Sequence, residues 1–88
     1  MQFMVTWTID IPQKAAAESR FLETGAAPPA GVELLGRWHS TGDRRGFMLL
    51  ESSDGVAVST YMRTWNDLIT FDITPVVNDE QLAKIMQS

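Results

Sequence analysis

Hydrophobic and polar residues alternate along four segments of the chain, with the period of two that is typical of β-strands. The segments are residues 2–10, 32–40, 46–52 and 68–77. Pro12 ends the first segment, because proline cannot donate to a central ladder, and Pro75 favours an edge position or the end of pairing for the last. The middle two are separated by a short Gly-containing turn, residues 41–45, which predicts an antiparallel hairpin.

Three further segments, residues 13–24, 55–64 and 78–86, have the composition and end residues of helices. Alanines open the first and Gly25 ends it, Ser53 and Asp54 can cap the second, and Asn78 or Asp79 can cap the third. The expected apolar stripes are Ala17, Phe21 and Leu22 in the first helix, and Ala57, Val58, Tyr61, Met62 and Trp65 in the second.

The resulting order is strand, helix, strand, strand, helix, strand, which is the split βαβ arrangement of ferredoxin-like folds. We therefore expect one α+β domain over residues 1–88, with a four-stranded antiparallel sheet and a short C-terminal helix. Two helices on one face of such a sheet leave the other face uncovered.

The alternation divides the strand residues between these two faces. The more apolar set, which we assign to the helix-covered core, is Phe3, Val5, Trp7, Ile9, Val32, Leu34, Trp38, Ile69, Phe71 and Ile73. The opposite set is Met4, Thr6, Thr8, Leu35, Arg37, His39, Thr70, Asp72 and Thr74, joined by Met48 and Leu50 if the third strand follows suit. This mixed face suits a homodimer interface that encloses a partly polar space.

Composition strengthens the expectation of self-association. A chain of 88 residues has a thin core, and without cysteine it has no disulfide or zinc–thiolate site to compensate. A net charge of −4 with scattered lysines and arginines argues against nucleic-acid binding. Apolar runs of only a few residues argue against a membrane span, and the N-terminus does not read as a secretory signal. The lack of cysteine fits a cytoplasmic location.

Four short motifs resemble those of a known family. They are FMVTW at residues 3–7, LGRWH at 35–39, WND at 65–67 and TPV at 74–76. Together they are similar to small bacterial proteins described as domain of unknown function 3303, among the dimeric α+β barrels. The resemblance implies a ferredoxin-like protomer whose exposed sheet face packs against a second copy. Proteins of that architecture include cofactor-independent monooxygenases, haem-degrading enzymes, isomerases and stress-response proteins, so the fold selects no activity.

His39 is the one histidine and so the one imidazole available for proton transfer near neutral pH. Arg37, two residues earlier, is expected on the same strand face, and Asp72 on the corresponding face of the last strand. Such a cluster could bind an acidic or enolic ligand and move a proton. The alternative is a polar patch held in hydrogen bonds or in the dimer interface.

The remaining candidate residues favour structural roles. Trp7, Trp38 and Trp65 could form walls for a planar ligand, but we expect them to anchor the core. Arg44 and Arg45 could clamp an anion, although solvated turn residues are the simpler interpretation. One histidine and no cysteine argue against a metal site, and the glycines fit no nucleotide-binding motif.

Three functional hypotheses remain from the sequence. The first is a small-molecule-binding homodimer without a cofactor, its ligand lined by Thr6, Thr8, Arg37, His39 and Asp72. The second is a cofactor-independent monooxygenase or isomerase of a planar phenolic or enolic compound, with His39 as the base and Arg37 stabilising an oxyanion. The third is a structural or regulatory dimer with a filled interface.

Overall fold

The computed structural model describes residues 1–42 and 44–88 and has the α+β architecture that the sequence predicts. Over these residues the strands are β1 (Gln2–Ile9), β2 (Glu33–His39), β3 (Arg45–Glu51) and β4 (Ile69–Val76), and the α-helices are α1 (Lys14–Thr24), α2 (Gly55–Arg63) and α3 (Asp79–Met86). A short 3-10 turn, Ile11–Gln13, leads into α1. Asp43, part of the predicted hairpin turn, lies outside the described residues.

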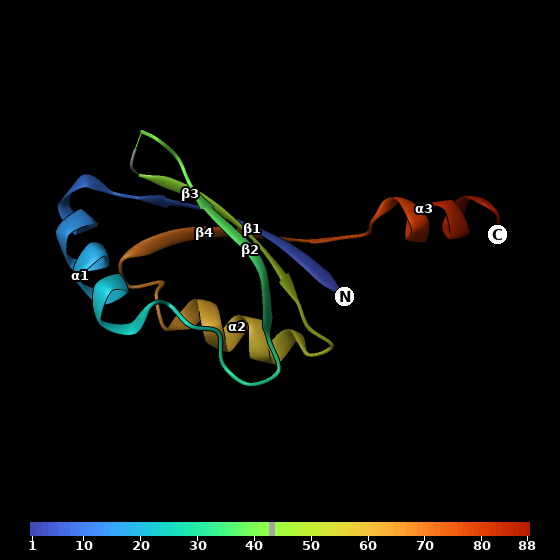
Figure 1. Cartoon of the computed structure of the whole chain (residues 1–88), viewed down its shortest axis with the longest axis horizontal. Helices are drawn as coiled ribbons and strands as arrows, with labels where there is room; N and C mark the ends of the chain where they lie inside the picture. The colour runs from blue at the N-terminus through green and yellow to red at the C-terminus, as the bar shows by residue number, and fades with distance from the viewer. Residues whose placement is uncertain (43) are drawn as a thin grey trace.

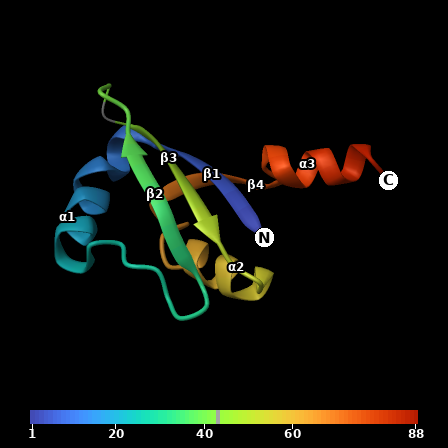
Figure 2. The same ribbon diagram turned by 45° about the vertical axis from the view of Figure 1, so that its right-hand side comes forward.

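The strands form one antiparallel sheet in the order β2-β3-β1-β4. Pro75 therefore lies on an edge strand, as its missing N–H requires. Helices α1 and α2 lie on one side of the sheet, and α3 extends beyond the end of β4 (Figures 1 and 2). We call the two sides the covered face and the open face. Within the described residues, no helix is both long enough and apolar enough for a membrane span.

The helix ends follow the predicted local chemistry. The Asp54 carboxylate accepts a hydrogen bond from the Val56 N–H at the start of α2, and Gly25 ends α1 with a φ of 66°. At the start of α3, Asn78 and Gln81 form a reciprocal capping box. These contacts satisfy backbone groups that a helix terminus would otherwise leave without partners.

The core lies between the covered face and α2. Its buried residues are Phe3, Val5, Trp7, Val32, Met48, Leu50, Val58, Tyr61 and Met62. The apolar stripe predicted for α2 is confirmed, since Val58, Tyr61, Met62 and Trp65 are buried. The Trp7 indole lies directly over the backbone of Gly46 on β3, where a side chain would collide with it. Glycine at this position therefore gives the largest core side chain its room.

A β-bulge in β2 changes the face on which its last residues lie. Leu34 pairs with Leu50 and Gly36 with Leu49, so Leu35 has no partner in the β3 register. Because the side-chain period of a strand is two, one extra residue shifts all the following side chains to the other face. From this point, residues 37 and 39 lie on the covered face, and residue 38 lies on the open face.

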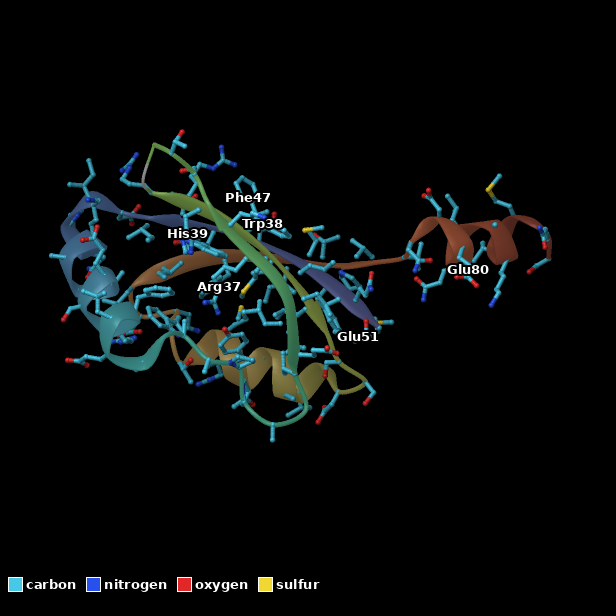
Figure 3. All side chains as sticks on the ribbon, in the orientation of Figure 1. Arg37, Trp38, His39, Phe47, Glu51 and Glu80 are labelled. Atoms are coloured by element: carbon cyan, nitrogen blue, oxygen red, sulfur yellow. The ribbon has the colours of Figure 1, made fainter. Side chains whose placement is uncertain are left out.

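This register corrects several face assignments made from regular alternation. Trp38 is not in the core: it pairs with Phe47 on the open face and is 59% exposed. Arg37 and His39 lie on the covered face instead of the open one, opposite Met48 and Gly46 (Figure 3). The conditional placement of Met48 and Leu50 on the open face is wrong as well.

Met48 and Leu50 belong to the buried core because β3 pairs Val5 with Met48 and Phe3 with Leu50. Directly paired residues of antiparallel strands share a face. In α1, Ala17 is buried as expected, but Leu22 does not extend the apolar stripe and is 85% exposed.

Candidate functional site

A pocket of about 400 Å³ lies between the covered face and the two helices that pack on it. Its size falls within the range of small-molecule sites, about 300–1,000 Å³. The lining residues include Trp7, Ile9, Ala17, Glu18, Phe21, Arg37, His39, Arg45, Tyr61, Met62, Trp65, Ile69 and Phe71. The buried residue of α1 is Ala17, whose small side chain fills little of the space between the helix and the sheet.

Arg37 enters this pocket from β2 and is held in a defined orientation. Its guanidinium donates hydrogen bonds to the carbonyls of Gly25 and Ala26, at 3.3 and 2.6 Å, and to the Tyr61 hydroxyl at 2.8 Å. The Tyr61 hydroxyl in turn donates to the Ala26 carbonyl. All three acceptors are uncharged, and none of the ion pairs among the described residues involves Arg37. Glu18 also lines the pocket, but its carboxylate pairs with Lys14 at 3.0 Å. The site therefore contains a positive charge, held in place by uncharged acceptors, that forms no ion pair with a carboxylate of the described residues.

His39 lies two residues further along β2, at the exposed side of the same pocket. Its ring makes edge contacts with Trp7 and Phe21, with centroid distances of 5.7 and 5.8 Å. Figure 3 shows Arg37 and His39 on the side of the sheet that faces α1 and α2. An oxyanion-binding group and a potential base therefore line one space, and aromatic rings surround it.

The other predicted ligand-binding residues lie elsewhere. Thr6 pairs with Phe47 and Asp72, and Thr8 pairs with Arg45 and Thr70, all on the open face. The sheet thus separates Thr6, Thr8 and Asp72 from Arg37 and His39. The bulge in β2 is the reason that the five predicted residues do not form one cluster.

Arg20 of α1 and Asp67, just after α2, were not predicted as partners but form an ion pair next to Trp65 of the pocket wall. The guanidinium donates two hydrogen bonds to the carboxylate, both at 2.8 Å, and a third to the Thr64 carbonyl at 2.9 Å. It also lies over the Trp65 ring, 5.4 Å from the centroid. This contact connects α1 to the segment that follows α2.

Comparison with known protein families identifies the chain. The family described as "Domain of unknown function (DUF3303)" matches residues 1–88. The chain belongs to this family. A search of curated proteins found no match. The match covers residues 1–88, so the pocket, the bulge and α3 all lie within the DUF3303 domain.

Sequence reasoning on this DUF3303 domain missed Arg20 and gave Tyr61 only a packing role. Spacing along the chain could not reveal the Arg20–Asp67 pair, whose members are 47 residues apart. The predicted burial of Tyr61 could have indicated a polar contact, since the hydroxyl of a buried tyrosine needs a hydrogen-bond partner. Among the described residues, no group of three His, Cys, Asp or Glu side chains is arranged to hold a metal ion.

The hydrogen bond from Arg20 holds the pKa of the Asp67 carboxyl below its ordinary value of 3.8. A lowered pKa in the folded state means that the unfolded state binds the proton more readily. The pair therefore stabilises the DUF3303 domain fully above the ordinary pKa, and this contribution is lost as pH falls through the folded value. We expect Asp67→Asn to lower the free energy of unfolding at neutral pH, with the difference from wild type shrinking in acid.

Urea unfolding at neutral pH and below the ordinary pKa of aspartate measures this difference. Arg20→Met is the matched control, because it removes the same pair from the other side. The double variant should be no less stable than the more affected single variant, as expected for two partners of one interaction. A stability difference that stays constant across this pH range would contradict the assignment.

Proposed function

We propose that this DUF3303 domain binds a small, flat, mostly apolar molecule with one acidic or enolic oxygen. The observation that carries this proposal is the Arg37 guanidinium inside an aromatic-lined pocket, hydrogen-bonded to uncharged acceptors only. Aromatic walls favour planar ligands, and a guanidinium fork fits a carboxylate or enolate. His39 at the exposed side of the pocket can accept a proton from the ligand.

Calorimetric titration with flat aromatic carboxylates and their uncharged amides tests the proposal. We expect the carboxylates to bind at least about tenfold more tightly than the amides, because a hydrogen bond to a charged group adds about 1.5–3 kcal/mol. Thr8→Val and Asp72→Asn are the controls: both change the open face and should leave binding unaltered. Equal binding of carboxylates and amides, or no binding of either, would contradict the proposal.

A cofactor-independent monooxygenase or isomerase is the second candidate. It is favoured by Arg37 and His39 lining the same pocket, since a base and an oxyanion-stabilising group are what proton abstraction next to a carbonyl or phenol requires. His39 would take the proton, and Arg37 would stabilise the resulting oxyanion. Oxygen consumption with a panel of hydroquinones separates a monooxygenase from a binding protein.

The open face supports a homodimer, which we propose as the working form of the chain. Met4, Trp38 and Phe47 are exposed there, together with the threonines of β1 and β4. Exposed apolar area on a sheet with no third layer is suited to pairing with a like surface. The partners that we propose are thus a second copy and a small molecule, in the reducing cytoplasm that a cysteine-free chain suits.

A further inference from the structure

Helix α3 projects from the domain and has no cover. Figures 1 and 2 show it beyond the end of β4, and every residue from 79 to 88 is exposed. The projection gives the chain a longest dimension of 49 Å and a radius of gyration of 14.5 Å. A compact chain of this length would have a radius of gyration of about 12 Å. The helix is therefore an arm, and its surface is available to another molecule.

The arm is amphipathic. Leu82, Ile85 and Met86 are 45%, 58% and 75% exposed, and their spacing puts them on one side of the helix. The helix has only eight residues, and isolated helices of that length are marginal in water even when well capped. Packing of the apolar side against a surface would supply the missing stabilisation.

Charge distinguishes the two ends of the sheet. The first turn of α3 carries Asp79 and Glu80, next to the end of the sheet where Val76 pairs with Gln2. At the opposite end, Arg44 lies in the turn between β2 and β3 and Arg45 begins β3, and the sequence of this turn has one acidic residue, Asp43. β1 has eight residues and spans about 26 Å, so the arm cannot reach this turn in its own molecule.

We propose that α3 docks on a second copy of this chain, with Asp79 and Glu80 against Arg44 and Arg45 of that copy. The proposal rests on the pairing of open faces proposed above. Two sheets related by a twofold axis with antiparallel strands bring the acidic end of each copy over the basic end of the other. A single twofold axis brings the arm of each copy to the basic end of the other, so the two contacts are identical, as in any isologous interface.

A second copy of the chain is the partner that fits both the basic turn and the open face. Among the described residues neither Arg44 nor Arg45 forms an ion pair, and Arg45 stacks over Phe47 on the open face, 5.8 Å from the ring centroid. The basic turn is thus continuous with the apolar open face. A second copy presents both an acidic arm for the basic turn and an apolar sheet face for the open face.

The cysteine-free sequence allows a direct test by disulfide cross-linking. The variants Glu80→Cys and Arg44→Cys are coexpressed with tags of different size, so that a mixed disulfide must join two copies. We expect the mixed cross-link to form under mild oxidation. The control pair is Glu80→Cys with Thr60→Cys. Thr60 is exposed on α2, on the covered side of the sheet, so this pair should not form the mixed cross-link.

Charge reversal gives a second, independent measurement. Asp79→Lys with Glu80→Lys should weaken the dimer about tenfold in sedimentation equilibrium, and Arg44→Glu with Arg45→Glu in the same chain should restore it. If the charge-reversal variants dimerise as tightly as wild type and the mixed cross-link does not form, docking of the arm is overturned, whereas pairing of the open faces is not. A full-length chain that stays monomeric at micromolar concentrations would overturn the pairing itself.

Discussion

Arg37→Met is expected to remove the preference of the pocket for carboxylate ligands and to weaken their binding about 10- to 100-fold. The reason is that Arg37 supplies the one positive charge held in hydrogen bonds within the described pocket lining. The same change removes the Arg37 donor from the Gly25 carbonyl and leaves the Ala26 carbonyl with the Tyr61 hydroxyl as its side-chain donor. We therefore also expect the free energy of unfolding to fall by about 1–3 kcal/mol.

Two further variants separate these effects on binding and stability. Arg37→Lys keeps the charge but loses the planar fork, so it should retain part of the carboxylate preference. Tyr61→Phe keeps Arg37 and removes the hydroxyl that orients it, and should weaken binding less than Arg37→Met. The deciding measurement is the ratio of carboxylate to amide affinity, which a general loss of stability does not alter. An unchanged ratio in Arg37→Met would show that the guanidinium does not contact the ligand.

Leu50→Ala is expected to lower the free energy of unfolding by about 2–5 kcal/mol, the usual cost of removing a fully buried leucine. Its side chain is 0% exposed in the core. A domain of this size has a total stability of only about 5–15 kcal/mol, so the loss should be visible as a large drop in the urea midpoint.

The neighbouring residue provides the matched control. Leu49 has the same side chain but pairs with Met4 on the open face. Leu49→Ala, measured at protein concentrations that favour the monomer, should cost less than half as much. Equal losses in the two variants would mean that the register of β3 is wrong, and with it the separation of the pocket from the open face.

The parts of the fold that could be predicted are those determined by local patterns. Strict alternation identified β1 and β4 and the faces of their residues, since both strands are regular over their length. The helix ends at Gly25, Asp54 and Asn78 followed from capping chemistry, which depends on a few neighbouring residues. The element order then led to the ferredoxin-like topology.

The face of each residue in β2 and β3 could not be predicted, because it depends on contacts between strands. Unbroken pairing of β2 from Leu34 onward would bring Trp38 opposite Gly46, where the Trp7 ring already lies. The bulge avoids this collision and lets Arg37 reach its acceptors across the pocket. In β3 both faces are apolar, so no pattern distinguishes the core residue Leu50 from Leu49.

The candidate site was predicted in part for the same reason. Arg37 and His39 were correctly expected to share a face, since both lie beyond the bulge. Their separation from Thr6, Thr8 and Asp72 follows from the single extra residue before them. The Arg20–Asp67 contact joins segments distant in the chain, and such pairs form only when the tertiary structure brings them together.

The distribution of the three tryptophans has a spectroscopic consequence. Trp7 and Trp65 are buried in the wall of the pocket, whereas Trp38 is exposed on the open face. The intrinsic fluorescence of the chain therefore combines two shielded indoles with one in water. If the proposed ligand and dimer form, we expect ligand entry to alter the emission of the first two, and pairing of two sheets to shift the emission of the third to shorter wavelength. In Trp38→Phe, the remaining fluorescence comes from the pocket alone.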